Sequence, residues 1–283
     1  MKVLVTGAAG QLGVDLVQHC TAAGDVVTAL DRGGLDITDR DAVFAAVAAA
    51  RPDSVINAAA YTAVDACETN VELAHAVNAT AVGHLADACA TTGSHLVQVS
   101  TDYVFDGLLE RPYVETDRTN PQSVYGTTKL AGEHLAAVGA DAAIARTSWV
   151  CGEHGNNMVK LVLRLAADVD RPLAFVDDQR GCPTFTADLA PALRRLALDR
   201  RTGVHHLTNA GAVSWYEFVR EILVAAGHDP GRVRPISTAD LDPPRPAPRP
   251  ANSVLDNEVW RHAGLEPLRD FRAPLAELIT RLT

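Results

Sequence analysis

A tyrosine and a lysine stand four residues apart in the stretch SVYGTTKLAG, residues 123–132. Pro121, just before this stretch, is typical of a helix start, and on a helix Tyr125 and Lys129 lie on one face. A phenol has a free pKa of about 10, and a nearby ammonium lowers that pKa because it stabilises the phenolate. The pair is therefore suited to exchange a proton with a carbonyl oxygen near neutral pH. The spacing alone also fits an exposed helix face, so other residues of the chain are needed to support a catalytic role.

A hydroxyl group is expected close to this pair. HLVQVS, residues 95–100, has the composition of a buried strand, and STD follows at residues 100–102. Open α/β sheets bind ligands at the carboxyl ends of their strands. Thr101 can donate a hydrogen bond to the carbonyl oxygen there. We therefore predict Thr101, Tyr125 and Lys129 as the catalytic residues, with Lys129 also holding the ribose of a nicotinamide.

Three glycines follow the first apolar run in VTGAAGQLG, residues 5–13. Gly7, Gly10 and Gly13 predict a tight turn that lets a helix N-terminus approach a pyrophosphate. Asp31, which ends the next apolar run, is placed to bind a ribose 2′-hydroxyl and to favour NADH. The neighbouring Arg32 could instead accept a 2′-phosphate. The sequence thus predicts a dinucleotide site and leaves NADH or NADPH open.

The elements that position these residues alternate along the chain. Short Val- and Ile-rich runs at 2–6, 26–30, 54–57, 95–100 and 142–147 are separated by Ala-rich segments of helical period. This order predicts a Rossmann-type, doubly wound parallel sheet over residues 1–150, which binds NAD(P). Residues 186–205 are expected to return to it, and residues 151–283 to form mainly a smaller α/β substrate-binding domain. Helices are expected at 156–168, 186–199, 214–227 and 270–281, with short strands near 172–176 and 204–207.

The composition restricts the partners. The formal net charge is −10, which disfavours binding of nucleic acid or anionic membrane. No apolar run reaches the roughly 20 residues of a membrane span, and MKVLVTGAAG resembles no signal peptide, so we expect a cytoplasmic protein. The five cysteines are scattered without metal-ligand spacing and are expected to be reduced thiols.

Eight segments in the right order carry a family resemblance. The chain resembles the extended short-chain dehydrogenase/reductases and, most closely, the dTDP-4-dehydrorhamnose reductases. The resemblance implies hydride transfer from NADPH or NADH to the 4-keto carbon of dTDP-6-deoxy-L-lyxo-4-hexulose, which gives dTDP-L-rhamnose. The segments are VTGAAGQLG (5–13), NAAAYTAVDACE (57–68), STDYVFDG (100–107), VYGTTKLAGE (124–133), RTSWV (146–150), GNNMVK (155–160), VDDQRGCPT (176–184) and RPANSVLD (249–256).

The same resemblance implies the binding residues. Thr101 and Asp102 would face the sugar, Trp149 would line its pocket, and Asn157 and Arg249 would contact the nucleotide unless they are capping or solvated residues. The proline-rich loop 241–250 is predicted to fold over the nucleotide, with its arginines meeting the diphosphate. Besides Tyr125 and Lys129, the cofactor would contact Gly7, Gly10, Gln11, Leu12, Gly13, Asp31, Arg32, Asp36, Ile37, Ala58, Ala59 and Ala60.

Some positions depart from the family pattern. Cys151 replaces a usual tyrosine and Met158 a common phenylalanine, and the acidic residues that hold magnesium at a dimer interface in some members have no counterpart here. We therefore expect no metal, and a monomer or a homodimer. Tyr103 stands where a nucleotide-sugar dehydratase would carry an acidic residue, which favours simple ketoreduction.

Two other functions stay open at this point. One is a ketoreductase for a different dTDP-deoxysugar, such as a dihydrostreptose synthase. The other is a non-catalytic partner of the same fold, like the regulatory subunit of methionine adenosyltransferase, against which the intact Thr101, Tyr125 and Lys129 argue.

Overall fold

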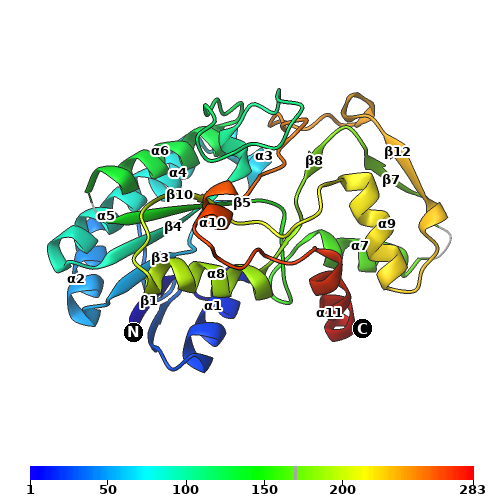
Figure 1. Cartoon of the computed structure of the whole chain (residues 1–283). Helices are drawn as coiled ribbons and strands as arrows, with labels where there is room; N and C mark the ends of the chain where they lie inside the picture. The colour runs from blue at the N-terminus through cyan, green and yellow to red at the C-terminus, as the bar shows by residue number, and fades with distance from the viewer. Residues whose placement is uncertain (140, 169–170) are drawn as a thin grey trace.

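A six-stranded parallel sheet, together with the helices that cover it, forms the larger part of the molecule (Figure 1). The computed structural model describes residues 1–139, 141–168 and 171–283. The strand order is β10-β5-β4-β3-β1-β2, and every neighbouring pair is parallel. The strands are β1 (Lys2–Thr6), β2 (Val26–Leu30), β3 (Ser54–Asn57), β4 (His95–Thr101), β5 (Ala142–Thr147) and β10 (Gly203–His206).

The direction of winding reverses between β1 and β3. From β1 the chain adds β2 on one side and then β3, β4, β5 and β10 on the other. At such a switch point the loops after the two strands diverge and leave a crevice. The glycine turn follows β1, and Ala58–Ala60 follow β3. Both predicted cofactor segments therefore lie at the switch point.

Helices cover both faces of this sheet, as the apolar runs require. Val3 and Val5 of β1 pack in one cluster with Leu16 of α1 and Leu193 of α8, whereas Leu4 faces the opposite cluster. Figure 1 shows α1 and α8 on one side and α2, α5 and α6 on the other. These helices are α1 (Gln11–Ala22), α8 (Thr186–Leu198), α2 (Arg40–Ala50), α5 (Ala81–Thr92) and α6 (Val124–Gly139). The last carries Tyr125 and Lys129 and begins three residues after Pro121.

A second hydrophobic cluster lies beside the sheet, centred on the edge-to-face pair Phe218 and Phe271. It is built by α7 (Met158–Ala166), α9 (Trp215–Ala225), α11 (Arg272–Leu282) and the parallel pair β7 (Leu173–Val176) and β12 (Val233–Ile236). Two further pairs of short strands contribute residues to this cluster. They are β6 (Val150–Cys151) with β9 (Thr184–Phe185) and β8 (Arg180–Gly181) with β11 (Val213–Ser214).

The fold class predicted from the sequence is confirmed. In the structure α8 packs on α1 and β10 joins the main sheet, and Trp260 and Leu268 also enter this core. Segment 241–250 contains neither helix nor strand. The division at residue 150 stays a prediction. The helical segment predicted between β3 and β4 begins with α4 (Val71–His75) and a π-helical turn at 76–80 before α5. Sequence periodicity missed the short helices α3 (Val64–Cys67) and α10 (Glu258–His262), because four or five residues carry too little pattern.

All five cysteines are buried and free. Over the described residues, no helix has both the length and the apolar character needed to cross a membrane. In the same part of the chain, His, Cys, Asp and Glu side chains do not gather in threes as a metal site requires.

Candidate active site

The three glycines of the turn after β1 have different roles. Gly7 has φ +67°, and a Cβ there would lie 2.7 Å from the backbone nitrogen of Ala59. A Cβ on Gly13 would lie 2.1 Å from the carbonyl oxygen of Gly7, so this position is closed by the turn itself. Gly10 is exposed, and a Cβ there would meet only the Gly7 carbonyl oxygen, at 3.1 Å. Gly7 and Gly13 thus let the turn pack on β3 and α1, whereas Gly10 keeps the outer side of the turn open to a ligand.

The N-terminus of α1 is suited to bind a phosphate. Gly10 is its N-cap, no side chain caps the helix, and its first turn carries no acidic residue. The free backbone N–H groups therefore point out of the helix end with the positive end of its dipole. Gln11 is held in place, since it donates to the Val150 carbonyl at 2.8 Å and accepts from Asn157 at 2.7 Å. Leu12 is buried in the core and can offer only its backbone.

The segment after β2 holds the predicted ribose-binding residues. Asp31 and Arg32 are exposed, and one oxygen of Asp31 accepts from the backbone of Gly33 and Gly34 at 3.0 and 2.9 Å. The carboxylate is thereby oriented by its own turn. Asp36 likewise accepts from the backbone and hydroxyl of Thr38, which lowers its pKa, and Ile37 is buried. Asp36 can therefore contact a cofactor only at the surface of the turn, and Ile37 only through its backbone groups.

A chain of buried hydrogen bonds links the ends of three strands to α6. Thr6 donates to Asn57 at 2.6 Å, and Asn57 donates to Gln98 at 2.7 Å. Gln98 and Lys129 then both donate to the carbonyl oxygen of Val99, each at 2.7 Å. These bonds fix the carboxyl ends of β1, β3 and β4 relative to the helix that carries Lys129.

Thr101, Asp102 and Tyr125 form a buried cluster at the end of β4, with exposures of 5%, 1% and 9%. Thr101 donates to Asp102 at 2.9 Å and accepts from the backbone of Tyr103 at 3.2 Å. Burial raises the pKa of Asp102 to about 6. Burial also raises the pKa of Tyr125, and the Thr101 hydroxyl partly opposes that rise. The predicted hydroxyl and phenol are therefore brought together, and the phenol is protonated at neutral pH.

Lys129 lies one helical turn beyond Tyr125 and is 4% exposed. Burial lowers its pKa to about 8, and Glu133 on the next turn opposes this shift. Glu133 forms a buried ion pair with Arg146 at 2.7 Å. The sequence predicted that Lys129 would lower the pKa of Tyr125. In this fold desolvation raises that pKa instead, and Lys129 is not among the main groups that shift it.

A pocket of about 300 Å³ lies next to this cluster. Tyr103 forms one wall, and its ring meets that of Tyr125 edge-on with centroids 5.5 Å apart. Trp215 also lines the pocket and stacks on Trp149 with ring centroids 3.5 Å apart. Trp149, which is outside the lining, therefore supports the Trp215 wall from behind. The lining residues are Tyr103, Met158, Leu161, Ala174, Phe175, Val176, Gln179, Trp215, Ile236, Leu241, Arg245 and Arg249.

Two predicted substrate residues have partners within the chain. Asn157 is the N-cap of α7, and its side chain binds Lys160, Gln11 and Gly152, which corresponds to the capping alternative. Arg249 lines the pocket, as its predicted role requires, and is also paired with Asp65 at 2.8 Å. Cys151 is a core residue, and burial raises its pKa to about 12.

Sequence reasoning missed several pocket residues. Trp215 follows Ser214, which forms a capping box with Glu217 at the start of α9, and a tryptophan at that position reads as core from the sequence alone. Phe175 showed no individual signal. Neither did Asp65, which is outside the pocket lining but pairs with the lining residue Arg249, although Asp65 lies within a segment that carried the family resemblance.

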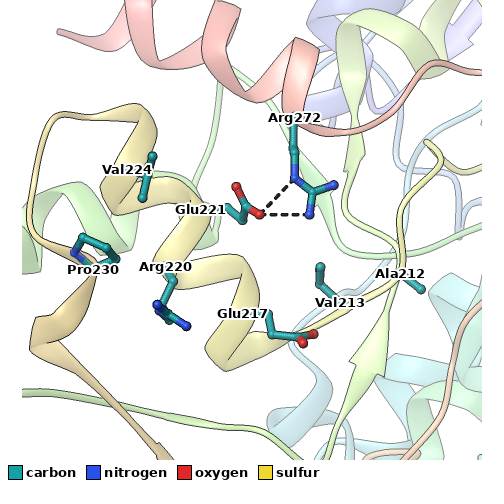
Figure 2. A pocket seen from close by; sticks show the side chains of 8 residues that line it. All are labelled: Ala212, Val213, Glu217, Arg220, Glu221, Val224, Pro230 and Arg272. Carbon is teal, nitrogen blue, oxygen red and sulfur yellow. Dashed lines mark hydrogen bonds and ion pairs between the residues drawn. The ribbon is translucent and has the colours of Figure 1, made fainter.

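A second groove of about 340 Å³ lies on the outer side of α9 (Figure 2). Glu221 and Arg272 pair across it at 2.9 Å. Its lining includes none of the predicted site residues, and its charged side chains are paired or exposed to solvent. The pocket at Tyr103 is therefore the better candidate.

Comparison with known proteins agrees with the family resemblance found in the sequence. The family model described as the RmlD substrate binding domain matches residues 1–283. A dTDP-4-dehydrorhamnose reductase of Streptomyces griseus is 49% identical over 97% of this chain and 91% of that protein. A crystal structure of a dTDP-4-dehydrorhamnose reductase from Clostridium acetobutylicum superposes with a TM-score of 0.95 at 40% identity, covering 100% of this chain and 99% of that one. That of the Bacillus anthracis protein, in complex with NADP, gives 0.94 at 34% identity, with 99% of each chain covered.

Proposed function

We infer the function of this chain from its family. The chain belongs to the family of the RmlD substrate binding domain, whose model matches residues 1–283. It is an oxidoreductase that uses a reduced nicotinamide dinucleotide to convert the 4-keto group of dTDP-4-dehydrorhamnose into the hydroxyl of dTDP-L-rhamnose. The observation that carries this proposal is the buried Thr101–Tyr125 cluster at the end of β4, which adjoins the pocket at Tyr103 and lies at the same edge of the sheet as the open glycine turn.

The chain supplies a proton and the positions of the reactants. When bound, the reduced nicotinamide supplies the hydride. Tyr125 donates the proton to the C4 oxygen, which its raised pKa permits because the phenol stays protonated at neutral pH. Thr101 orients that oxygen beside the phenol by turning its hydroxyl proton from Asp102 to the substrate. Lys129, whose pKa of about 8 leaves it mostly charged at pH 7, stabilises negative charge that develops there and holds the nicotinamide ribose.

The pocket at Tyr103 is proposed to take the nucleotide part of the substrate. Phe175 and Trp215 offer flat apolar surfaces for a pyrimidine base, and Arg245 and Arg249 offer charge for the diphosphate. Trp149, behind Trp215, would set the position of that wall. Apart from Tyr103, this pocket is lined by residues after 150, which agrees with the proposed substrate-binding role of 151–283.

The glycine turn and the segment after β2 are proposed to bind the cofactor. Gly7 and Gly13 leave no room for a Cβ, which lets the turn pack tightly, and Gly10 keeps the outer side of the turn open to a dinucleotide. We propose that both NADH and NADPH are used. The oriented carboxylate of Asp31 favours the 2′-hydroxyl of NADH, and the exposed Arg32 can partly offset its repulsion of a 2′-phosphate.

The test is oxidation of NADPH or NADH, followed by absorbance, with purified dTDP-4-keto sugars. We expect turnover of dTDP-4-dehydrorhamnose and a loss of at least about 100-fold in kcat for Tyr125→Phe, which removes the proton donor. Binding of dTDP by Tyr125→Phe should be unchanged, since the pocket is intact. Turnover of only the dihydrostreptose precursor, or full activity of Tyr125→Phe, would contradict the proposal.

A further inference from the structure

One carboxylate holds the proline-rich segment 241–250 against α3. We call this segment the strap. In Figure 1 it runs from the end of β12 back toward α3. Asp65, on α3, accepts hydrogen bonds from Arg249 at 2.8 Å, from the backbone of Ala247 at 3.2 Å and from Arg245 at 3.3 Å. A second contact joins Asp65 to the other terminal nitrogen of Arg249, so this pair is bidentate.

The pairing is stronger than that of an ordinary surface ion pair. The Asp65 side chain is 31% exposed and that of Arg249 only 14%. The Arg249 guanidinium is the main cause that lowers the pKa of Asp65 to about 2. Exposed single ion pairs contribute little to stability, but a bidentate pair with one partner nearly buried also fixes geometry. Ala247 is buried between the two arginines, which anchors the strap at its centre.

Arg249 faces both Asp65 and the pocket. A guanidinium has five N–H groups, and here two face Asp65 while a third donates to the Ala247 carbonyl at 2.7 Å. The Tyr103 hydroxyl is a further hydrogen-bond partner of this guanidinium. Arg249 lines the pocket together with Tyr103 and Arg245. The two arginines share one carboxylate, so a net positive charge is left at the pocket wall.

We propose that Asp65 is a positioning residue for nucleotide-sugar binding, which holds the strap over the pocket and aims the Arg249 guanidinium at the diphosphate. This inference rests on the proposed function of the pocket. Asp65 itself need not contact the substrate. Its effect reaches the substrate through Arg249, and the family resemblance gave no role to this residue.

The proposal predicts a change in substrate affinity without a change in chemistry. In Asp65→Asn we expect the KM for the dTDP-sugar to rise about tenfold, as for the loss of one well-placed charged contact, with kcat within about twofold of wild type. The KM for NADPH should not change. Binding of dTDP alone, measured by calorimetry, should weaken by the same factor as the KM rises.

A matched control is Asp199, which also accepts from two arginines, Arg195 at 2.8 Å and Arg201 at 3.1 Å. It lies at the end of α8, outside the pocket lining. Asp199→Asn should leave the KM for the dTDP-sugar unchanged. If Asp65→Asn fails to fold, Asp65→Glu retains the charge on a longer side chain, and a smaller rise in KM is expected.

A double-mutant cycle tests whether Asp65 acts through Arg249. Arg249→Ala should raise the KM for the dTDP-sugar, and adding Asp65→Asn to it should produce no further rise. Additive effects, an unchanged KM in Asp65→Asn, or tighter dTDP binding in that variant would overturn the positioning role. Failure of the wild-type protein to reduce any dTDP-4-keto sugar would instead refute the proposed function, whatever Asp65 does to dTDP binding.

Discussion

Replacing Lys129 by methionine should remove activity and at the same time stabilise the protein. Lys129 is buried, and its pKa falls from the ordinary 10.5 to about 8. At about 1.4 kcal/mol for each pKa unit, keeping this ammonium charged in the fold costs about 3 kcal/mol at neutral pH. The unfolded chain binds the proton more tightly, so the cost is complete below pH 8 and disappears as the pH rises toward 10.5.

Methionine removes that cost with little disruption of the surroundings. The Val99 carbonyl would lose the Lys129 donor but retain Gln98 at 2.7 Å, and Glu133 would retain Arg146. Allowing about 1 kcal/mol for the lost hydrogen bond, Lys129→Met should be more stable than wild type by about 2 kcal/mol at pH 7. For a chain of this length that corresponds to a rise in Tm of about 3 °C.

Urea unfolding of both proteins at pH 7 and at pH 10.5 provides the measurement. The stability advantage of Lys129→Met should shrink to zero or reverse at the higher pH, and groups that titrate equally in both proteins cancel from the difference. Lys160→Met, at a partly exposed position on α7, should show no such pH-dependent difference. A Lys129→Met protein that is destabilised equally at both pH values would refute the reasoning.

Three further substitutions test the site. Gly7→Ala should lower the free energy of unfolding by about 1–2 kcal/mol, because the residue has φ +67°. It should also raise the cofactor KM at least about tenfold, because the new Cβ would lie 2.7 Å from the backbone after β3. Gly24→Ala, with φ +81° and nothing within 4 Å, should show only the loss of stability from the backbone. Asp31→Ala should raise kcat/KM with NADPH relative to NADH, and an unchanged ratio would exclude a role in cofactor choice. Gly181→Ala should raise the KM for the dTDP-sugar, since its Cβ would lie 2.5 Å from the Trp149 ring and displace it toward the pocket wall; equal KM values would contradict this.

The elements of the sheet and the local motifs could be read from the sequence because their signals are short-range. Apolar runs separated by helical periods specified a parallel sheet, and three glycines after its first strand specified the turn. Tyr125 and Lys129 are one helical turn apart, so their common placement needs only that α6 forms. Each of these features depends on residues within a few positions of one another.

Tertiary structure alone decided the partners and the electrostatics. Asp65 meets Arg249 across 184 positions of the chain, and Gln11 meets Asn157 across 146, so no local pattern could pair them. Packing also set the direction of the pKa shift on Tyr125, because desolvation depends on what surrounds the phenol and not on the spacing to Lys129. The sequence by itself determined which groups could do the chemistry, and the folded chain determined which of them are buried, paired or left open to a substrate.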